Sequence, residues 1–191
     1  MQALIDRIRA QAVHVGGGIV KVDGFLNHQV DASLIMAIGE CFAERFGSLA
    51  ASGINKVVTA EVSGIAPALA TAHALDVPMV YARKHRSAVM TDVYYLARAN
   101  SRTQTEQVDL MISKNYLLPR DQVLLIDDFL ATGSTIRALC ELVSAGGATL
   151  MGIGCVIEKP AEKGRQHLDF LRVPIESLAT VKVVDEQLQV S

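Results

Sequence analysis

The residues best suited to chemistry lie in one short run, residues 123–135, which reads Val-Leu-Leu-Ile-Asp-Asp-Phe-Leu-Ala-Thr-Gly-Ser-Thr. An apolar, strand-like stretch leads into Asp127 and Asp128, and a small hydroxyl-rich loop then opens a helical pattern. Such a loop can direct backbone N–H groups, its hydroxyls and a helix N-terminus at one phosphate. Two carboxylates beside it can accept hydrogen bonds from a sugar diol. The run therefore predicts a site for a ribose 5-phosphate.

Two alternatives for the same run involve no sugar phosphate. An apolar strand that ends in acids is also typical of a Walker B strand, but that strand works with a G-x-x-x-x-G-K-[ST] loop. The sequence contains no such loop, which disfavours nucleotide hydrolysis. The remaining alternative is a simple helix cap.

The elements expected around this run alternate between strands and helices. Short apolar or β-branched runs predict core strands at 56–60, 79–82, 123–126 and 150–157. Apolar spacing of three or four residues predicts helices that start at Asp31 or Ser33 and run to Phe46, and that span 65–75 and 134–145. Two more strands, 93–97 and 108–112, predict an antiparallel excursion with a mobile polar link over 100–106. Before the glycines at 16–18 we expect only an amphipathic turn.

This alternation predicts an α/β fold with a mainly parallel central sheet flanked by helices. With 191 residues and 50% hydrophobic residues, the chain has enough apolar material for one compact domain. Each core strand is expected to end at polar residues, in the pairs Glu61/Ser63, Arg83/Lys84, Asp127/Asp128 and Glu158/Lys159. Ligands of open parallel sheets bind outside the carboxyl ends of the strands. We therefore expect the four pairs to converge on one site.

Residues 123–135 resemble the phosphoribosyl pyrophosphate signature of the phosphoribosyltransferase family. Other stretches are similar to the bacterial xanthine phosphoribosyltransferases, namely 21–29, 62–68, 82–85, 152–154 and 156–159. The resemblance implies a type I phosphoribosyltransferase fold in a single domain, residues 1–191, with a small hood built from about 1–30 and 158–191. It also implies purine salvage: the 5-phosphoribosyl group of phosphoribosyl pyrophosphate would be transferred to xanthine, giving xanthosine 5′-monophosphate and pyrophosphate.

The resemblance also implies a role for each matched position. Asp127 and Asp128 would be catalytic and hold the ribose hydroxyls. The 5-phosphate would be bound by Ala131, Thr132, Gly133, Ser134 and Thr135. The pyrophosphate would be bound by Glu61, Val62, Ser63, Gly64, Arg83 and Lys84, the last two often across a homodimer interface in the family. The base would be bound by Val20, Asn27 and Lys159.

The base end favours an oxopurine. The Lys159 ammonium can only donate hydrogen bonds, and xanthine carries carbonyl oxygens at positions 2 and 6, whereas adenine carries an amino group at 6. Ala131 departs from hypoxanthine–guanine enzymes, which often place an acid there, and Val20 is smaller than the family's usual aliphatic residue. The alternatives are adenine or guanine phosphoribosyltransferase activity. Phe129 either stacks on the base or belongs to the core.

A resident metal site is not expected. The five histidines show no metal-binding spacing, so the magnesium that the resemblance implies would arrive as Mg²⁺ on the substrate phosphates. The polar tip of the excursion, residues 101–106, either closes over the site to exclude water or is a plain surface hairpin.

Composition excludes several other classes of protein. The net charge of −2 and pI near 6.2 argue against binding to nucleic acid or anionic membranes. Three cysteines without paired spacing, and no signal or membrane-spanning stretch, favour a cytoplasmic protein. A regulator that senses phosphoribosyl pyrophosphate is disfavoured, because the residues before Val20 are too few and not basic enough for a DNA-binding module.

Overall fold

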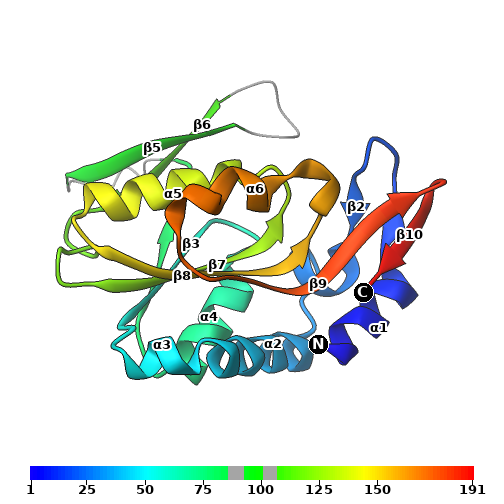
Figure 1. Ribbon diagram of the computed structural model, residues 1–191, viewed down its shortest axis with the longest axis horizontal. Helices are drawn as coiled ribbons and strands as arrows, with labels where there is room; N and C mark the ends of the chain where they lie inside the picture. Colours follow the sequence, from blue (N-terminus) through cyan, green and yellow to red (C-terminus); the bar gives the residue numbers. More distant parts are fainter. Residues whose placement is uncertain (86–92, 101–106) are drawn as a thin grey trace.

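A six-stranded sheet with the strand order β10-β9-β8-β7-β3-β4 forms the centre of the molecule (Figure 1). The computed structural model describes residues 1–85, 93–100 and 107–191. The parallel strands are β3 (Lys56–Ala60), β4 (Met79–Ala82), β7 (Gln122–Leu130), β8 (Thr149–Glu158) and β9 (Ile175–Val184). The short β10 (Gln187–Val190) runs antiparallel to β9. The predicted α/β class and mainly parallel sheet are confirmed.

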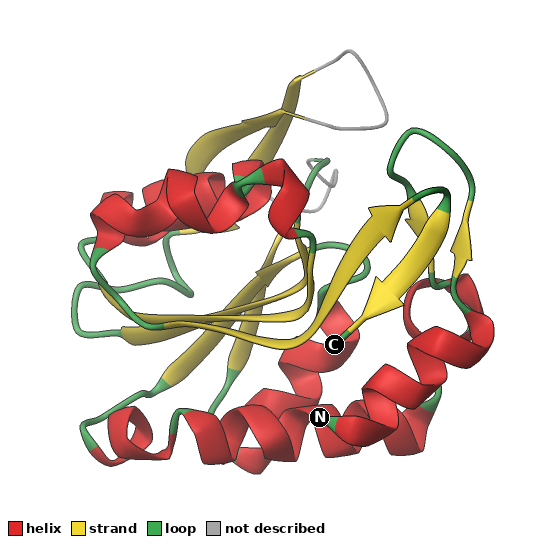
Figure 2. Ribbon diagram, turned by 45° about the vertical axis from the view of Figure 1, so that its right-hand side comes forward, coloured by secondary structure: helices red, strands yellow, loops and turns green. Residues whose placement is uncertain are grey.

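Helices cover both faces of this sheet (Figure 2). On one face lie α2 (Ala32–Arg45), α3 (Gly47–Ala51) and α4 (Ile65–Ala74), and on the other lie α5 (Ser134–Ala145) and α6 (Gly164–Leu168). Successive strand residues point to opposite faces, so Val57 and Leu124 join the core under α2 and α4, while their neighbours Val58 and Leu125 join the core under α5. This two-sided burial explains why the strands read as continuous apolar runs.

The starts of helices α2 and α5 follow from their local sequence. Of the two candidate caps for α2, Asp31 is the one used, since its Oδ1 accepts a hydrogen bond from the backbone N–H of Leu34 over 3.1 Å. At the α5 start, Gly133 has a left-handed φ of +81°, a conformation that residues with a Cβ rarely adopt.

The two ends of the chain lie side by side at one edge of the molecule (Figure 1). The N-terminal part comprises α1 (Gln2–Gln11), β1 (Val13–His14), β2 (Val20–Lys21) and the short π-helix η1 (Asp23–Asn27). The Arg9 guanidinium donates to the Val190 carbonyl of β10 over 2.8 Å, and the amino terminus donates to the Leu178 carbonyl of β9 over 3.1 Å. The expected N-terminal turn is instead a helix of 10 residues, because Leu4 and Ile8 find a core to pack against.

The predicted antiparallel excursion is present as a separate two-stranded ladder. It pairs β5 (Tyr94–Asn100) with β6 (Gln107–Ser113), and a single bridge between Arg83 and Met111 connects β6 to the end of β4. The expected mobile link and its tip, residues 101–106, lie outside the described residues.

One difference from the sequence prediction bears on the site. The strand expected at 123–126 continues to Leu130, so Asp127 and Asp128 lie within β7 rather than after it. Pairing with β8 sustains the extension, since Asp127 is opposite Cys155 and Phe129 opposite Ile157. After β8 the chain forms two 3₁₀ turns, η2 (Pro160–Glu162) and η3 (Asp169–Leu171), on either side of α6. Within the described part of the chain, no helix is long and apolar enough to cross a membrane.

Candidate active site

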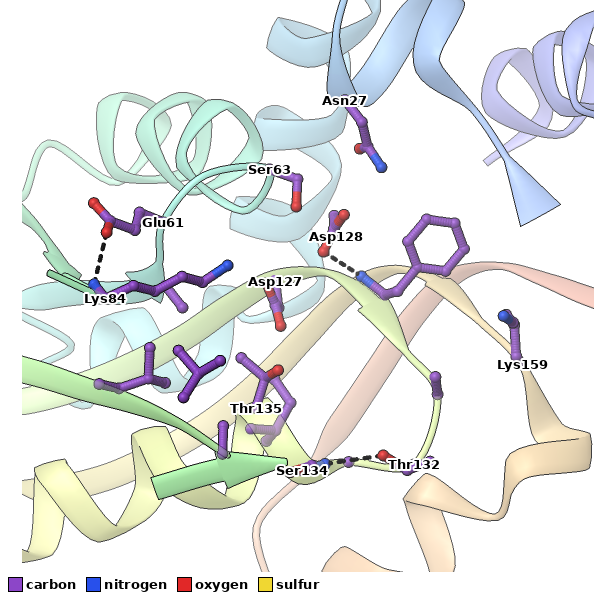
Figure 3. A pocket seen from close by; sticks show the side chains of 18 of the residues that line it. Asn27, Glu61, Ser63, Lys84, Asp127, Asp128, Thr132, Ser134, Thr135 and Lys159 are labelled. Carbon is purple, nitrogen blue, oxygen red and sulfur yellow. Dashed lines mark hydrogen bonds between the residues drawn. The ribbon is translucent and has the colours of Figure 1, made fainter. Parts of the chain in front are cut away.

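A cavity of about 370 Å³ opens at the carboxyl ends of the parallel strands (Figure 3). The structure gathers most of the predicted site residues around it. Those that line the cavity are Val20, Asn27, Glu61, Ser63, Lys84, Asp127, Asp128, Ala131, Thr132, Gly133, Ser134, Thr135 and Lys159. Groups more than a hundred residues apart in the chain therefore face one space.

Three predicted site residues do not line this cavity. The Val62 side chain is 70% exposed and points into solvent. Gly64 lies beneath the cavity floor, where an added Cβ would collide with the Thr59 hydroxyl and come within 2.7 Å of the Asp127 Oδ1 atom. Arg83 sits at the end of β4 with its guanidinium 5.8 Å from the centre of the Tyr81 ring.

The acidic pair lies at the centre of the cavity floor. Asp127 and Asp128 are adjacent in β7, and the Asp128 carboxylate accepts a hydrogen bond from the backbone N–H of Phe129 over 2.9 Å. Burial, together with the negative charge of Asp128, raises the pKa of Asp127 well above its usual value, against the attraction of the Lys84 ammonium. Burial also raises the pKa of Asp128, although the Ser63 hydroxyl stabilises its charged form. Raised carboxyl pKa values in a cleft are typical of functional sites.

The loop from Ala131 to Thr135 forms the wall next to α5. Ser134 is the first residue of that helix and lines the cavity, so the N-terminal end of α5 adjoins the loop there. The Thr132 hydroxyl accepts from the Ser134 N–H at a long 3.4 Å, a weak contact that a stronger acceptor can replace. This geometry suits one phosphate group.

The loops after β3 and β4 form the opposite wall. The peptide bond between Glu61 and Val62 is cis. The Glu61 carboxylate accepts a hydrogen bond from the backbone N–H of Lys84 over 2.6 Å, which ties the two loops together. The Lys84 side chain extends over the cavity toward Asp127 (Figure 3). This wall offers a cation to an anionic ligand.

The third wall comes from the N-terminal segment and the end of β8. The Asn27 Oδ1 atom is buried and has no hydrogen-bond partner in the described structure, so it is an acceptor available to a ligand. The Lys159 ammonium donates to the Gly18 carbonyl over 2.9 Å and pairs with the Glu162 carboxylate over 3.0 Å. It lies 5.7 Å from the centre of the Phe129 ring, which faces the cavity between these groups.

Sequence reasoning missed the apolar part of the cavity wall. Ala99, Val108 and Leu110 of the β5–β6 ladder line the cavity, whereas Tyr95 and Arg98 of the same ladder do not. Those residues are occupied elsewhere: Arg98 pairs with Asp109 over 3.1 Å, and the Tyr95 ring packs 5.0 Å from the Lys114 ammonium. Alternation along the strand is the signal that could have identified the inward-facing residues.

The oxygen donors around the cavity suit a metal ion that is held mainly by the substrate's phosphates rather than by the protein. The described residues contain no group of three or more histidine, cysteine, aspartate or glutamate side chains able to hold a metal ion. Asp127, Asp128 and Glu61 supply carboxylates around the cavity, and Mg²⁺ prefers oxygen ligands and usually keeps several waters or phosphate oxygens. The site therefore fits Mg²⁺ carried by a polyphosphate.

Comparison with known protein families matches residues 28–190 to the phosphoribosyl transferase domain. Among curated proteins, the chain is 50% identical to the xanthine phosphoribosyltransferase of Deinococcus deserti over 186 residues, which are 97% of this chain and 95% of that protein. It is 41% identical to the xanthine phosphoribosyltransferase of Pediococcus pentosaceus, over 100% of this chain and 98% of that one.

Solved structures show the same fold. The adenine phosphoribosyltransferase of Giardia lamblia, complexed with 9-deazaadenine, superposes with a TM-score of 0.75 at 23% identity and covers 92% of this chain and 96% of that one. The enzyme from Saccharomyces cerevisiae gives a TM-score of 0.72 at 24% identity, covering 93% and 99%. At these identities the likeness concerns the fold alone.

Proposed function

Since the chain belongs to the phosphoribosyl transferase domain family, we propose that it is a purine-salvage enzyme that transfers the 5-phosphoribosyl group of phosphoribosyl pyrophosphate to xanthine. The products are xanthosine 5′-monophosphate and pyrophosphate. The C1–O bond to pyrophosphate breaks, a bond from C1 to a ring nitrogen of xanthine forms, and the proton of that nitrogen passes to the released pyrophosphate or to solvent.

One observation carries this proposal beyond the family. A single cavity brings together three kinds of wall: a helix-start loop for a phosphate, a Lys84 wall for a second anion, and a base-sized end with Asn27 and Lys159. The acidic pair lies between them. These groups correspond in kind to the 5-phosphate, ribose, pyrophosphate and base of the reacting complex.

The residues act mainly by positioning and by electrostatic stabilisation. The loop from Ala131 to Thr135 holds the 5-phosphate, and the backbone from Glu61 to Gly64 together with Lys84 holds the leaving pyrophosphate. Asp127 and Asp128 accept hydrogen bonds from the ribose hydroxyls. As the C1–O bond breaks, positive charge develops on the sugar, and two carboxylates beneath it stabilise that charge more than they stabilise the ground state.

The base end selects by hydrogen bonding. Asn27 Oδ1 accepts from an N–H of the base, and the Lys159 ammonium, which already donates to Gly18 and Glu162, keeps a third proton for a carbonyl oxygen. Val20 and Phe129 contact the flat faces of the ring. An adenine amino group at the Lys159 position would leave donors facing each other, a buried mismatch of about 1–3 kcal/mol.

Magnesium enters this scheme with the substrate. When bound, Mg²⁺ neutralises charge on the pyrophosphate as it leaves. Asp127, Asp128 and Glu61, whose carboxylates line the cavity, would hold the ion through its water ligands.

Arg83 acts in the site of a second copy of the chain, in a homodimer. It does not line its own cavity, and it directly follows the edge strand β4, with its guanidinium near the Tyr81 ring. Three apolar side chains of this part of the chain are exposed to solvent: Tyr81 at 37%, Leu69 at 57% and Val62 at 70%. An apolar surface of this kind next to an anion site fits a partner whose pyrophosphate needs another cation. The segments of about 1–30 and 158–191 form the hood over the base.

The deciding experiment is a panel assay of xanthine, guanine, hypoxanthine and adenine with phosphoribosyl pyrophosphate and Mg²⁺, with sedimentation to measure the oligomeric state. We expect the highest kcat/KM for xanthine and a dimer that dissociates when Tyr81 and Leu69 are both changed to Asp. A preference for adenine or guanine would replace the proposed substrate. No turnover of any base, with phosphoribosyl pyrophosphate still bound, would indicate a sensor instead.

A further inference from the structure

The short helix α6 rests directly on the loop that we assign to the 5-phosphate. A Cβ added at Gly164 would collide with the Ala131 carbonyl oxygen and come within 2.9 Å of the Gly133 nitrogen. In turn, a Cβ added at Gly133 would lie 3.2 Å from the Gly164 carbonyl oxygen. The two backbones are therefore in contact along a line where no side chain fits.

A histidine of the same helix fixes one peptide group of the loop. The His167 Nδ1 atom lies 3.1 Å from the Thr132 carbonyl oxygen. A carbonyl oxygen only accepts, so Nδ1 carries a hydrogen and donates it. The peptide group between Thr132 and Gly133 is planar, and a carbonyl held toward His167 turns the Gly133 N–H to the side away from it. His167 thus sets the direction of an N–H in the phosphate loop.

The helix itself is anchored to the sheet by a charged cluster. The Arg165 guanidinium forms a fork with the Glu158 carboxylate at the end of β8, with Nε–Oε1 and Nη2–Oε2 distances of 3.0 and 2.5 Å. It also donates to the Ile175 carbonyl of β9 over 2.6 Å. The Ser177 hydroxyl donates to Glu158 over 2.7 Å. Because α6 is fixed on one side by the sheet, it can hold the loop on its other side.

We propose that α6 is a positioning element for the phosphate site, in which His167 and Gly164 hold the loop backbone in the shape that binds the 5-phosphate. This inference rests on the proposed function. Neither residue lines the cavity, so both act through the loop. Their loss weakens binding of the phosphoribosyl group and leaves the base end, which is held by Asn27 and Lys159, unchanged.

The first test compares three substitutions at one position, with calorimetric titration of ribose 5-phosphate and of phosphoribosyl pyrophosphate with Mg²⁺. His167→Ala should weaken both affinities about three- to tenfold, the effect of one hydrogen bond, and raise the KM for phosphoribosyl pyrophosphate without changing that for xanthine. His167→Asn should restore affinity, because its amide nitrogen takes the place of Nδ1. His167→Gln should not, because its amide reaches the place of Nε2. The matched control is His73→Ala, an exposed histidine on α4.

The second test uses the glycine contact. Gly164→Ala must push Ala131 and Gly133 aside, so we expect at least a tenfold loss of affinity for ribose 5-phosphate. Gly47→Ala is the matched control, since no atom lies within 4 Å of its ideal Cβ position. Melting temperatures measured in parallel separate loop displacement from unfolding.

The outcomes distinguish this inference from the function on which it rests. Unchanged affinity in His167→Ala, or equal affinities in the Asn and Gln variants, would overturn the positioning role. The proposed function would still stand if the wild type binds phosphoribosyl pyrophosphate and turns over xanthine. Equal losses for xanthine and phosphoribosyl pyrophosphate would also overturn it, since they indicate general loosening. If His167→Ala unfolds, the Asn and Gln pair still decides. A wild type that binds neither ligand would refute the proposed function and this inference together.

Discussion

Two buried polar clusters lie at the opposite ends of strands β3 and β7, and they differ in the source of their hydrogen-bond and charge partners. At the amino ends, the Lys56 ammonium lies 2.6 Å from the Asp121 carboxylate and donates to the Tyr116 carbonyl over 2.8 Å. The same Asp121 oxygen accepts from the Leu118 N–H over 2.8 Å. At the carboxyl end, Asp127 and Asp128 lie side by side, and burial raises the pKa of both.

The difference separates groups that the fold needs from groups that the ligand needs. A buried charge is stable only when it is paired or hydrogen-bonded. The Lys56–Asp121 pair receives its partners from the chain itself and lies at the end of the sheet opposite the cavity. The acidic pair faces the cavity, where the Phe129 N–H and the Ser63 hydroxyl stabilise Asp128. Under the proposed function, the ribose hydroxyls and the cationic charge of a bound complex are its further partners. Stability and activity should therefore respond oppositely to changes at the two ends.

The largest effect is expected at the structural end. Lys56→Met leaves Asp121 buried without its cation, which should lower the free energy of unfolding by about 3–5 kcal/mol. Denaturant unfolding measures this loss. Adding Asp121→Asn should recover part of it by removing the unpaired charge, and kcat/KM of the folded enzyme at 20 °C should stay at the wild-type value. A variant with wild-type stability would show that the pair contributes nothing to the fold.

The next effect belongs to the functional end. Asp127→Asn keeps shape but loses the charge that meets the ribose and the developing cation, so kcat/KM should fall about 10- to 100-fold, the equivalent of roughly 1.5–3 kcal/mol. Its melting temperature at neutral pH should be unchanged or higher, because a buried charge has been removed. Asp128→Asn should behave alike. Near-wild-type turnover in both variants, or a stability loss like that of Lys56→Met, would erase the contrast between the two ends.

A smaller effect is expected at the base end, where a residue has partners from both the chain and the ligand. Lys159 donates to Gly18 and Glu162, so its ammonium stays in place without a base. Lys159→Ala should reduce the ratio of xanthine to adenine kcat/KM about tenfold, near the lower limit for one charge-assisted hydrogen bond. Affinity for phosphoribosyl pyrophosphate should remain at the wild-type level. A ratio that does not change would mean that this lysine serves the fold alone, as Lys56 does.

Local sequence signals predicted the elements that surround the site. The strands at 56–60 and 79–82 and the helix at 134–145 have the predicted bounds, because β-branched runs, apolar spacing and glycine breaks act within a few residues. The predicted end of β7 was wrong, because two aspartates favour a loop locally whereas pairing with β8 keeps them in the strand. Tertiary contacts of this kind override local propensity.

The candidate site was predictable to the extent that its residues lie at strand ends. The parallel order β4-β3-β7-β8 brings polar residues from all four strand ends to one cavity, as expected from the alternation of strands and helices. Arg83 and Glu158, which were expected there too, do not line it. The contact between α6 and the phosphate loop was not predictable, since Gly164 lies outside every motif of the sequence and is far from Ala131 in the chain. The same holds for the apolar wall from Ala99, Val108 and Leu110, which depends on how the ladder is placed over the sheet.

The smallest expected effect is the pH dependence of stability and of ligand binding at the acidic pair. Burial raises the pKa of Asp127 well above 3.8, so between 3.8 and the raised value the folded chain holds protons that the unfolded chain has lost. Stability of the free enzyme should therefore fall as pH rises through this window and level off above it. The affinity for ligand should depend on pH in the opposite direction. Ribose hydroxyls and Mg²⁺ favour the charged carboxylates, so complex formation should release a fraction of a proton, and affinity should increase with pH over the same window.

Calorimetric titration of phosphoribosyl pyrophosphate in two buffers of different ionisation enthalpy measures this release directly, and thermal unfolding across pH measures the stability slope. Asp127→Asn should remove most of both effects, whereas the double variant Lys56→Met/Asp121→Asn should keep the proton release, because its charges lie at the other end of the sheet. If binding released no proton in wild type, the acidic pair would already be fully charged before the ligand arrives. Its stabilising partners would then have to come from the chain, as they do for Asp121, and the two ends of β7 would not differ in kind.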